Sequence, residues 1–291
     1  LFQLKKIVKN KIKMIQPQII HSHGLRPDII NSNLSGHKRV STLHNYPFED
    51  YILRYGKFVG NIALYTHMRA LKKLDHVTVV SGQLAERLSK NLKCTPIPNG
   101  VNINLFKPVK NKEKIRKELN LPVNKKIFIY VGHLAHLKDP LTIVSAFNSL
   151  NSNFVLLLLG RGELESNIKQ NITNENIHLL GFKSEIHKYL QAADYFVFSS
   201  LSEGFGLVTA EAMACGLPVI LSNIPAHNEF FKYKKSIGLS FEKQNIKDLN
   251  QKIHEIIERD YNELSLSSRK IVELYFSSEK MVKNYEKIYI S

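Results

Sequence analysis

Short apolar runs alternate with helical patterns along the chain from Pro17 onward. Strand-like segments occur at 18–22, 39–44, 76–81, 95–98, 126–132, 153–160, 177–181, 195–200 and 219–222. Segments between them, such as 82–92, 140–150 and 207–214, carry helical spacing. The run 154–159 (FVLLLL) is apolar without interruption, which indicates a strand buried on both faces. This alternation predicts an α/β protein with parallel sheets.

The 291 residues favour two domains, at roughly 100–200 residues each. Residues 107–126 are polar and basic, with Pro108 and Pro122 as breakers, so they predict a linker with a short helix. We therefore expect one domain over 1–106 and a second over 107–291, the latter closed by helices within 246–290. Such folds bind ligands at the carboxyl ends of their strands.

The charge balance limits the partners. Lys and Arg number 41 against 25 Asp and Glu, a net charge of +16 that suits nucleic acid, anionic membranes or phosphorylated ligands. The basic residues are scattered without an aromatic–basic ladder, so no nucleic-acid partner is expected. The run 154–159 is far shorter than the roughly 20 apolar residues of a membrane-spanning helix.

Metal and disulfide chemistry also find little support. The two cysteines, Cys94 and Cys215, form no CxxC pair, which favours a reducing compartment. No two aspartates lie two positions apart, so the DxD arrangement that holds a divalent cation against a diphosphate is absent from the sequence. His21 and His23 on one strand face could bind zinc, but no third ligand is close in sequence. We expect neither a metal nor another cofactor.

The stretch 199–216 (SSLSEGFGLVTAEAMACG) carries the strongest chemical signal. A strand ends, a glycine-containing loop follows, and a helix begins at Gly206. Free N–H groups at such a helix start suit an anionic group. Glu203 lies in the loop, and Glu211 lies on a helix face that could look into the same cleft. By pattern alone, a first-turn acid and a surface acid explain these two residues equally well.

The segment from Glu203 to Glu211 resembles the E-x7-E motif of retaining glycosyltransferases of the GT-B fold, family GT4. Further landmarks occur in the family's order: His21-Ser-His23-Gly24, Thr42-Leu-His44, Val80-Ser81, Pro98-Asn-Gly-Val101, Tyr130-Val-Gly132, Leu159-Gly-Arg-Gly162, Leu180-Gly-Phe182 and Ala192-Ala-Asp194. The resemblance implies two Rossmann-like domains facing a cleft. Family members usually start with a strand and a Gly-rich loop that do not precede Leu1 here, so we expect the first domain to be incomplete.

The resemblance also implies roles for individual residues. Lys138 matches the lysine that grips the donor diphosphate, and a metal-free site needs such a fixed cation. His133 stands where the family commonly carries Arg, and it cannot make the forked contact of a guanidinium. Glu211 matches the acid that accepts hydrogen bonds from the ribose, and Glu203 the one facing the donor sugar. His44 resembles the histidine that faces the reacting sugar across the cleft.

The remaining expected contacts come from the backbone and the nucleobase loop. The backbone of Gly204, Phe205, Gly206 and Leu207 would donate N–H groups to phosphate or sugar. The other expected binding positions are Gly132, Gly181 and Phe182. The catalytic residues predicted by this resemblance are Glu203, His44 and Lys138.

The leading hypothesis is a glycosyltransferase that moves a sugar from a UDP- or GDP-linked donor to a glycan or lipid-linked acceptor. The resemblance implies retention of the anomeric configuration, and it suggests a role in surface polysaccharide synthesis. One alternative is a nucleotide-sugar-binding remnant with impaired catalysis, motivated by His133 and by the missing first segment. A sugar epimerase of the same fold is a further alternative, although the E-x7-E pattern argues for a transferase.

The first residues, LFQLKKIVKNKIKMI, predict a basic amphipathic helix. Leu4, Ile7, Val8, Ile12 and Ile15 share one face, which we expect to pack on the first domain's sheet in the full-length protein. The lysines of this helix could each contribute about 1 kcal/mol at an anionic membrane, or they could simply form a solvated face. We predict a cytoplasmic protein with peripheral, salt-sensitive attachment to the inner face of the membrane.

Overall fold

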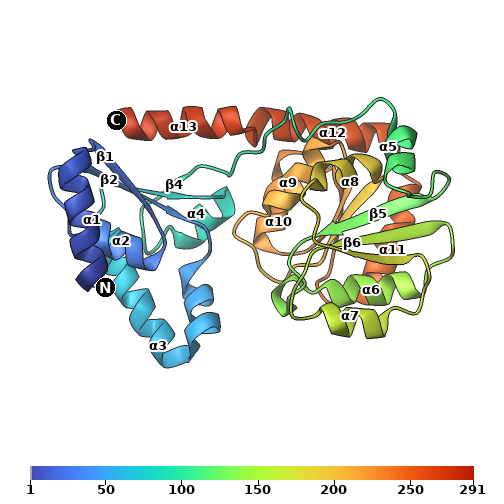
Figure 1. Ribbon diagram of the computed structural model, residues 1–291, viewed down its shortest axis with the longest axis horizontal. Helices are drawn as coiled ribbons and strands as arrows, with labels where there is room; N and C mark the ends of the chain where they lie inside the picture. Colours follow the sequence, from blue (N-terminus) through green and yellow to red (C-terminus); the bar gives the residue numbers. More distant parts are fainter. Residues whose placement is uncertain (1) are drawn as a thin grey trace. The chain divides into compact units, whose positions relative to one another are not determined.

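The computed structural model describes residues 2–291, which form two compact units (Figure 1). Unit 1 contains the chain up to Pro98 together with Met281–Ser291, and unit 2 contains Asn99–Lys280. Each unit is a Rossmann-like arrangement of a parallel sheet with helices, which confirms the predicted α/β class.

The observed division differs from the predicted domains 1–106 and 107–291. Val101 joins unit 2 because it forms a parallel bridge with Ser277, and its N–H donates to the carbonyl of Phe276 at 2.8 Å. The final residues join unit 1 because Tyr285 and Tyr289 bond to its strands. Both contacts link distant parts of the sequence, so local patterns could not reveal them.

Unit 1 contains a four-stranded parallel sheet in the order β1-β2-β3-β4. Its strands are β1 (Ile19–His23), β2 (Lys38–Leu43), β3 (His76–Val79) and β4 (Thr95–Pro96). Its helices are α1 (Phe2–Ile15), α2 (Leu25–Asn31), α3 (Pro47–Leu71) and α4 (Gly82–Leu88), and α13 (Ser278–Ile290) contributes its last turns. The four strands match the predicted segments, whereas α2 and α3 were not predicted.

A buried polar chain ties the helices of unit 1 to its sheet. Ser22 Oγ donates to Asp28 Oδ1 at 2.6 Å, and His67 Nε2 lies 2.7 Å from Asp28 Oδ2. The Tyr51 hydroxyl lies 2.5 Å from His67 Nδ1. All four side chains are buried, so each bond replaces one lost to water. The chain fixes α3 to α2 and β1.

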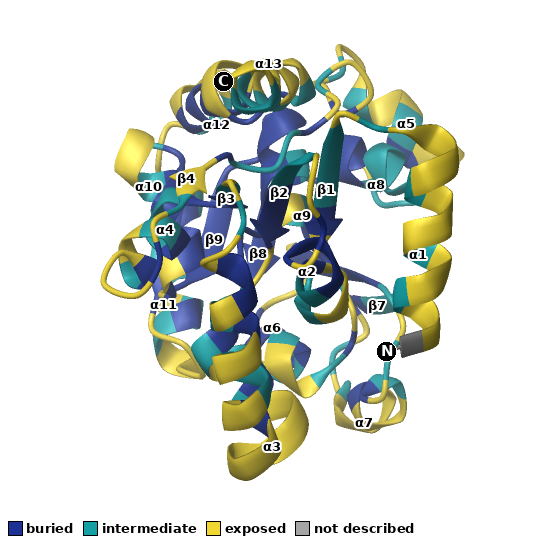
Figure 2. Ribbon diagram, turned by 90° about the vertical axis from the view of Figure 1, so that its left-hand side faces the viewer, coloured by how far each residue is buried: buried dark blue, intermediate teal, exposed yellow. Residues whose placement is uncertain are grey.

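The side chains of helix α1 are largely exposed in this chain. From residue 3 to residue 15 none of its side chains is buried, and Figure 2 shows the helix exposed or intermediate along its length. Leu4 and Ile7, on the apolar face, are 47% and 60% exposed. Among the described residues, no helix combines the length and the hydrophobicity needed to cross a membrane.

Unit 2 contains a six-stranded parallel sheet in the order β10-β9-β8-β5-β6-β7. The strands are β5 (Lys126–Val131), β6 (Phe154–Leu159), β7 (Ile177–Gly181), β8 (Tyr195–Phe198), β9 (Val219–Ser222) and β10 (Gly238–Phe241). Every residue of β6 is buried, as its unbroken apolar run predicts. Strand β10 was not predicted. The order reverses between β5 and β8, and ligands bind such sheets outside the carboxyl ends at this switch point.

The helices of unit 2 cover its sheet and include the linker helix predicted from the sequence. They are α5 (Lys112–Glu118), the short 3₁₀ helix η1 (His136–Lys138), α6 (Pro140–Asn148), α7 (Glu165–Asn171), α8 (Ile186–Ala192), α9 (Leu207–Ala214), α10 (Pro225–Tyr233), α11 (Ile246–Ile257) and α12 (Tyr261–Tyr275). Arg116 of α5 is buried and donates to Asp194 at 2.7 Å. Asp194 also accepts from Lys112 at 3.0 Å, so the linker helix is anchored to the sheet.

Candidate functional site

The loops at the carboxyl ends of the unit 2 strands are joined by backbone hydrogen bonds. The N–H of Leu134 donates to the carbonyl of Arg161 at 2.9 Å, which connects the loops after β5 and β6. The N–H of Leu201 donates to the carbonyl of Leu137 at 2.9 Å, which connects the loops after β5 and β8. These bonds gather the predicted binding residues of unit 2 at the switch point.

Lys138 and Glu203 form an ion pair at this point. Lys138 Nζ lies 2.5 Å from Glu203 Oε1, and the two side chains are 25% and 12% exposed. Ser199 Oγ donates to the carbonyl of Asp139 at 2.6 Å, and Ser200 Oγ to that of Leu137 at 3.1 Å. The segment bearing Lys138 is therefore held against the end of β8. The structure brings these two predicted catalytic residues together, while their roles stay predictions.

Helix α9 begins at the same place, with Gly206 as its N-cap. Gly206 has φ +90°, in the left-handed region that favours glycine. Its carbonyl accepts from the N–H of Thr209 at 3.0 Å, which starts the helix. The first N–H groups of a helix, here those of Leu207 and Val208, have no partner within it. This end of α9 therefore offers N–H donors and a partial positive charge to an anion.

Two buried polar atoms beside Gly206 have no hydrogen-bond partner in the part of the chain that the structure describes. They are Thr209 Oγ1 and His227 Nε2. A Cβ placed on Gly206 would lie 3.4 Å from Thr209 Oγ1 and 3.8 Å from the His227 ring. Buried polar atoms without partners are rare, so two at one glycine indicate a position where a ligand or a water supplies the missing bonds.

His227 is neutral in this surrounding. Its Nδ1 lies 2.9 Å from the carbonyl of Ser222, which can only accept, so Nδ1 carries the proton and Nε2 is left as an acceptor. Burial lowers the pKa of His227 to about 4. The charge of Lys138 acts in the same direction, and the bond to Ser222 acts against it. Sequence reasoning missed His227, because a lone histidine in a helix carries no signal. It also passed over Thr209, although Thr209 lies inside the E-x7-E segment.

Glu211 lies on α9, past the unpartnered N–H groups. Its side chain is half-buried and makes no recorded hydrogen bond among residues 2–291, and burial alone perturbs its carboxyl group. Burial raises the pKa of Glu211 to about 7. A half-ionised carboxyl group without donors would be stabilised as the anion by hydroxyl groups of a ligand.

A cavity of about 370 Å³ extends from the ends of β5, β6 and β7. Its lining is Val131, Gly132, His133, Leu159, Gly160, Arg161, Phe182, Lys183 and Ile186. Phe182 is 65% exposed, so its ring is available to a flat partner. The structure thus brings together the predicted Gly132, His133 and Phe182, and Gly181 precedes Phe182 at the end of β7.

His44 belongs to unit 1, where it follows β2. Its Nε2 lies 2.9 Å from Nδ1 of His23, and the ring of His23 stacks on that of His21 with centroids 4.5 Å apart. Burial lowers the pKa of His44, and the neighbouring His23 lowers it further, so the imidazole is neutral at neutral pH. His44 also lines a cavity of about 210 Å³ together with Tyr51, Arg54 and other residues.

His21 is enclosed by hydrogen bonds. Its Nδ1 lies 2.7 Å from the Tyr289 hydroxyl, and its Nε2 lies 2.8 Å from Thr42 Oγ1. Burial lowers the pKa of His21 to about 4. The two histidines singled out for zinc therefore have other partners, and across residues 2–291 no group of three or more His, Cys, Asp or Glu is placed to hold a metal ion.

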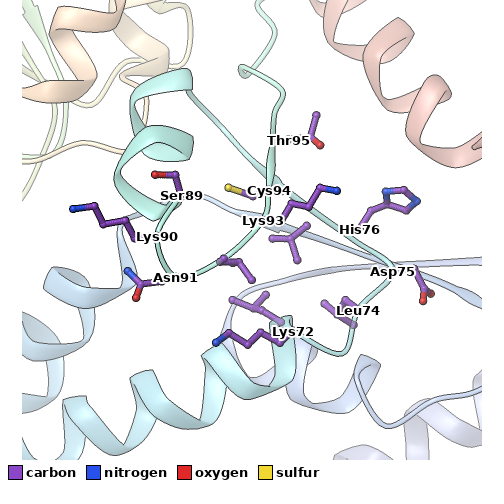
Figure 3. A pocket seen from close by; sticks show the side chains of 13 residues that line it. Lys72, Leu74, Asp75, His76, Ser89, Lys90, Asn91, Lys93, Cys94 and Thr95 are labelled. Carbon is purple, nitrogen blue, oxygen red and sulfur yellow. The ribbon is translucent and has the colours of Figure 1, made fainter.

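A further cavity, of about 540 Å³, lies where β3 and β4 begin (Figure 3). Lys72, Lys90, Lys93 and Cys94 are among its lining residues. Figure 3 shows that Lys90 and Lys93 extend in opposite directions, so these charges do not converge on one ligand. Burial raises the pKa of the Cys94 thiol, which keeps it protonated. We assign no site to this cavity.

Two family models match the chain. The one described as Glycosyl transferases group 1 matches residues 111–271, and the one described as Glycosyltransferase Family 4 matches residues 1–105. The UDP-Gal:alpha-D-GlcNAc-diphosphoundecaprenol alpha-1,3-galactosyltransferase of Escherichia coli is 32% identical over 78% of this chain, and the match spans 62% of that relative's length.

One further relative and one solved structure extend the comparison. The O-antigen biosynthesis glycosyltransferase WclY of Escherichia coli is 29% identical, and the match covers 99% of this chain and 83% of WclY. The crystal structure of Anabaena Alr3699/HepE in complex with UDP superposes with a TM-score of 0.84 and 18% identity. That match covers 98% of this chain and 82% of the other, which shows a common fold.

Proposed function

The chain belongs to the glycosyl transferases group 1 family, and we propose that it transfers a sugar from a nucleotide-diphosphate donor to a hydroxyl group of an acceptor. One observation carries this proposal above the others. A fixed cation (Lys138), the N-terminus of α9 and the unpartnered carboxyl group of Glu211 converge at the switch point of the unit 2 sheet. This set matches the phosphates and the ribose of such a donor.

The donor would bind across these groups in order. Its diphosphate would accept from the N–H groups of Leu207 and Val208 and would replace Glu203 as the partner of Lys138. The ribose hydroxyls would donate to Glu211. The base would enter the 370 Å³ cavity against Phe182. Glu203, released from Lys138, would then be free to contact the donor sugar.

The reaction follows from these positions. The bond between the anomeric carbon and the diphosphate oxygen breaks, and a bond to the acceptor oxygen forms on the same face, with retention. The departing phosphate takes the proton of the acceptor hydroxyl, so no protein base is required. Lys138 and the N-terminus of α9 stabilise the charge that develops on the diphosphate. Neutral His44 of unit 1 keeps its predicted role as a hydrogen-bonding group for the sugar, and we expect no metal to be required.

The acceptor is proposed to be a glycan or a lipid-linked sugar, as used in surface polysaccharide assembly. Two relatives support this choice, because one is named for a diphosphoundecaprenol acceptor and the other for O-antigen biosynthesis. The first is also named for UDP-Gal, so we favour a UDP-linked donor over a GDP-linked one. We place the reaction at the cytoplasmic face of a membrane, with the lysines of α1 contributing reversible attachment.

A donor screen tests this proposal. UDP- and GDP-linked sugars are incubated with the protein and lipid-linked acceptors, and products are read by mass spectrometry. Transfer from one donor is expected, and Lys138→Ala and Glu211→Ala should abolish it while leaving the melting temperature unchanged. Transfer at the wild-type rate by both variants would contradict the assignment.

A second candidate is a protein that binds a nucleotide sugar without turning it over. His133, which lines the cavity where the family commonly carries Arg, favours this possibility. Calorimetry with UDP and GDP beside the transfer assay separates the two candidates. Nucleotide binding without transfer or donor hydrolysis would support binding alone.

A further inference from the structure

Helix α3 exposes an unusual amount of apolar surface. Six large side chains along it are at least half exposed, and we call them the α3 apolar face: Leu53, Tyr55, Phe58, Val59, Ile62 and Tyr65. Phe58 is the most exposed of them, at 80%. An apolar surface gathered on one element, in contrast to scattered exposed residues, marks a site of interaction.

The helix is built as a hairpin of two arms. Gly56 has φ +73° and ψ 171°, which interrupts the helix, and Figure 1 shows the two arms of α3 projecting from the sheet of unit 1. Gly60 on the second arm faces the first so closely that a Cβ there would lie 2.6 Å from the carbonyl oxygen of Tyr51. The bond between Tyr51 and His67 joins the same two arms. The apolar face is therefore carried by a packed element.

The second arm separates two faces. Phe58, Val59, Ile62 and Tyr65 lie at positions i, i+1, i+4 and i+7, which places them on one side of a helix. The opposite side carries the buried residues Gly60, His67, Ala70 and Leu71. One side of the second arm thus packs into the core of unit 1. The other side, which bears the exposed apolar residues, is not covered by any of the residues that the structure describes.

The charges that follow the first turn of α3 are all positive. Residues 51–74 contain Arg54, Lys57, Arg69, Lys72 and Lys73 but no Asp or Glu. Only Arg54 has an acidic partner among the described residues, Asp50 at 3.0 Å. By helical periodicity, Arg69 continues the side that bears Phe58, and Lys72 and Lys73 follow directly after the helix ends at Leu71. Apolar residues followed by unpaired cations fit the acyl region and the headgroups of an anionic lipid bilayer.

We propose that the α3 hairpin docks on an anionic bilayer, with Phe58 and Ile62 among the acyl chains and Arg69, Lys72 and Lys73 at the headgroups. A second copy of this chain fits less well, because two such basic faces would repel each other. The inference rests on the proposed function in one respect. Tyr51, Arg54 and Tyr55 of α3 line the 210 Å³ cavity that contains His44, so a bilayer at this hairpin would hold a lipid-linked acceptor beside that histidine.

Vesicle flotation tests the apolar part of this surface. Vesicles of phosphatidylcholine with phosphatidylglycerol should bind the protein, and vesicles of phosphatidylcholine alone should bind it far less. Phe58→Ser combined with Ile62→Ser should weaken binding at least about tenfold, since both apolar anchors are lost. The matched control is Leu266→Ser with Leu274→Ser on α12, where the two side chains are 71% and 51% exposed. This control should bind like the wild type.

The charged part is tested by replacing Arg69, Lys72 and Lys73 with Gln. Each cation near an anionic surface is worth roughly a fivefold change in binding, so the triple variant should lose about a hundredfold at low salt. High salt should weaken the wild type in the same way. The replaced side chains are exposed, so the melting temperature should be unchanged, and that measurement shows that the variants fold.

Several outcomes would overturn the inference. One is that the α3 variants bind vesicles like the wild type while Ile7→Ser with Met14→Ser in α1 abolishes binding. Another is that the α3 variants lose self-association in sedimentation with vesicle binding intact, which would make a second copy the occupant. Absence of binding to either vesicle would also contradict it.

A separate readout distinguishes this inference from the proposed function. The α3 variants should keep wild-type transfer to a water-soluble acceptor analogue and lose it on an acceptor embedded in vesicles. If the wild type transfers sugar to none of the acceptors, only the proposed function is contradicted, because vesicle binding is measured without turnover.

Discussion

Each unit contains a buried polar cluster, one around His21 and the other around His227, and the two clusters differ in their hydrogen-bond partners. In unit 1, His21 of β1 has hydrogen-bond partners on both ring nitrogens. In unit 2, His227 of α10 has partners on Nδ1 alone, and Thr209 Oγ1 of α9 has none among the described residues. Burial lowers the pKa of both histidines to about 4, so burial does not distinguish them. What differs is whether the protein itself completes the hydrogen bonds.

This difference indicates where a ligand is needed. The cluster of unit 1 is completed by Tyr285 and Tyr289 of α13, so its shape is set without a ligand. The cluster of unit 2 leaves Thr209, His227 and Glu211 open beside the N-terminus of α9. A buried polar group gains free energy when a partner arrives, and the open cluster is therefore the one we expect to respond to a nucleotide.

The largest expected effect is on nucleotide affinity, when Lys138 of the ion pair with Glu203 is replaced. Lys138→Ala removes the cation that would face the diphosphate, and it should weaken the binding of UDP or GDP roughly ten- to a hundredfold, as expected for a charged hydrogen bond. Calorimetry measures this loss. Lys169→Ala is the matched control, because Lys169 forms a 2.9 Å pair with Glu165 on the exposed surface. An equal loss in both variants would show that general charge, not this position, controls binding.

Two threonines compare the closed and open clusters directly. Thr42 Oγ1 bonds to His21, Thr78 and Tyr285, so Thr42→Val should lower the free energy of unfolding by about 1–3 kcal/mol. Thr209→Val removes a hydroxyl without a recorded partner, and it should leave the unliganded protein equally stable or more stable. Urea unfolding measures both. A larger loss for Thr209→Val than for Thr42→Val would contradict the comparison.

Much of the fold followed from local patterns. The strand over 154–159 was predicted from apolar residues alone, and burial of all six confirms it. Helix α9 was predicted with its observed bounds, because Gly206 and Gly216 flank it. Helix α3 was missed because its apolar residues point both toward the core and toward solvent, and Gly56 interrupts the period. The docking of Tyr289 on His21 joins residues 268 positions apart, which no local pattern encodes.

The candidate site was predicted unevenly for a related reason. Glu203 and Glu211 bound a motif whose spacing is visible in the sequence, and Lys138 was predicted from its match to a family lysine. The structure places Lys138 and Glu203 in contact. His227 comes from α10, which was not predicted, and only the folded chain brings its ring beside Gly206. Whether the ring nitrogens of His21 and His227 find hydrogen-bond partners depends on residues distant in the chain, so the sequence could not distinguish the two clusters.

A smaller effect is expected at the start of α9. Gly206→Ala puts a side chain at φ +90° and within 3.4 Å of Thr209 Oγ1, which should cost about 1–2 kcal/mol of stability. Nucleotide binding should weaken several-fold because the N–H groups shift. Gly36→Ala shares a positive φ of +81° but meets nothing within 4 Å, so it should lose stability without losing affinity. Equal affinities for the two variants would remove the role given to this end of α9.

The most direct test of the open cluster is the proton balance of nucleotide binding. Because burial raises the pKa of Glu211 to about 7 from its ordinary 4.5, the folded chain favours the protonated form. This contribution to stability is complete below pH 4.5 and is lost as the pH rises through 7. Ribose hydroxyls that donate to Glu211 would stabilise its anion, so binding should expel part of a proton near pH 7.

Calorimetry of UDP binding at pH 7, in two buffers with different ionisation enthalpies, measures that proton. The terminal phosphate of UDP contributes equally in the wild type and in Glu211→Gln, so the difference between the two proteins reports Glu211. Our account predicts that the wild type releases more protons on binding UDP than Glu211→Gln does. It also predicts that the affinity of the wild type for UDP exceeds that of the variant above pH 7, where Glu211 is ionised. Equal proton release in the two proteins, or no binding of UDP or GDP by the wild type, would contradict it.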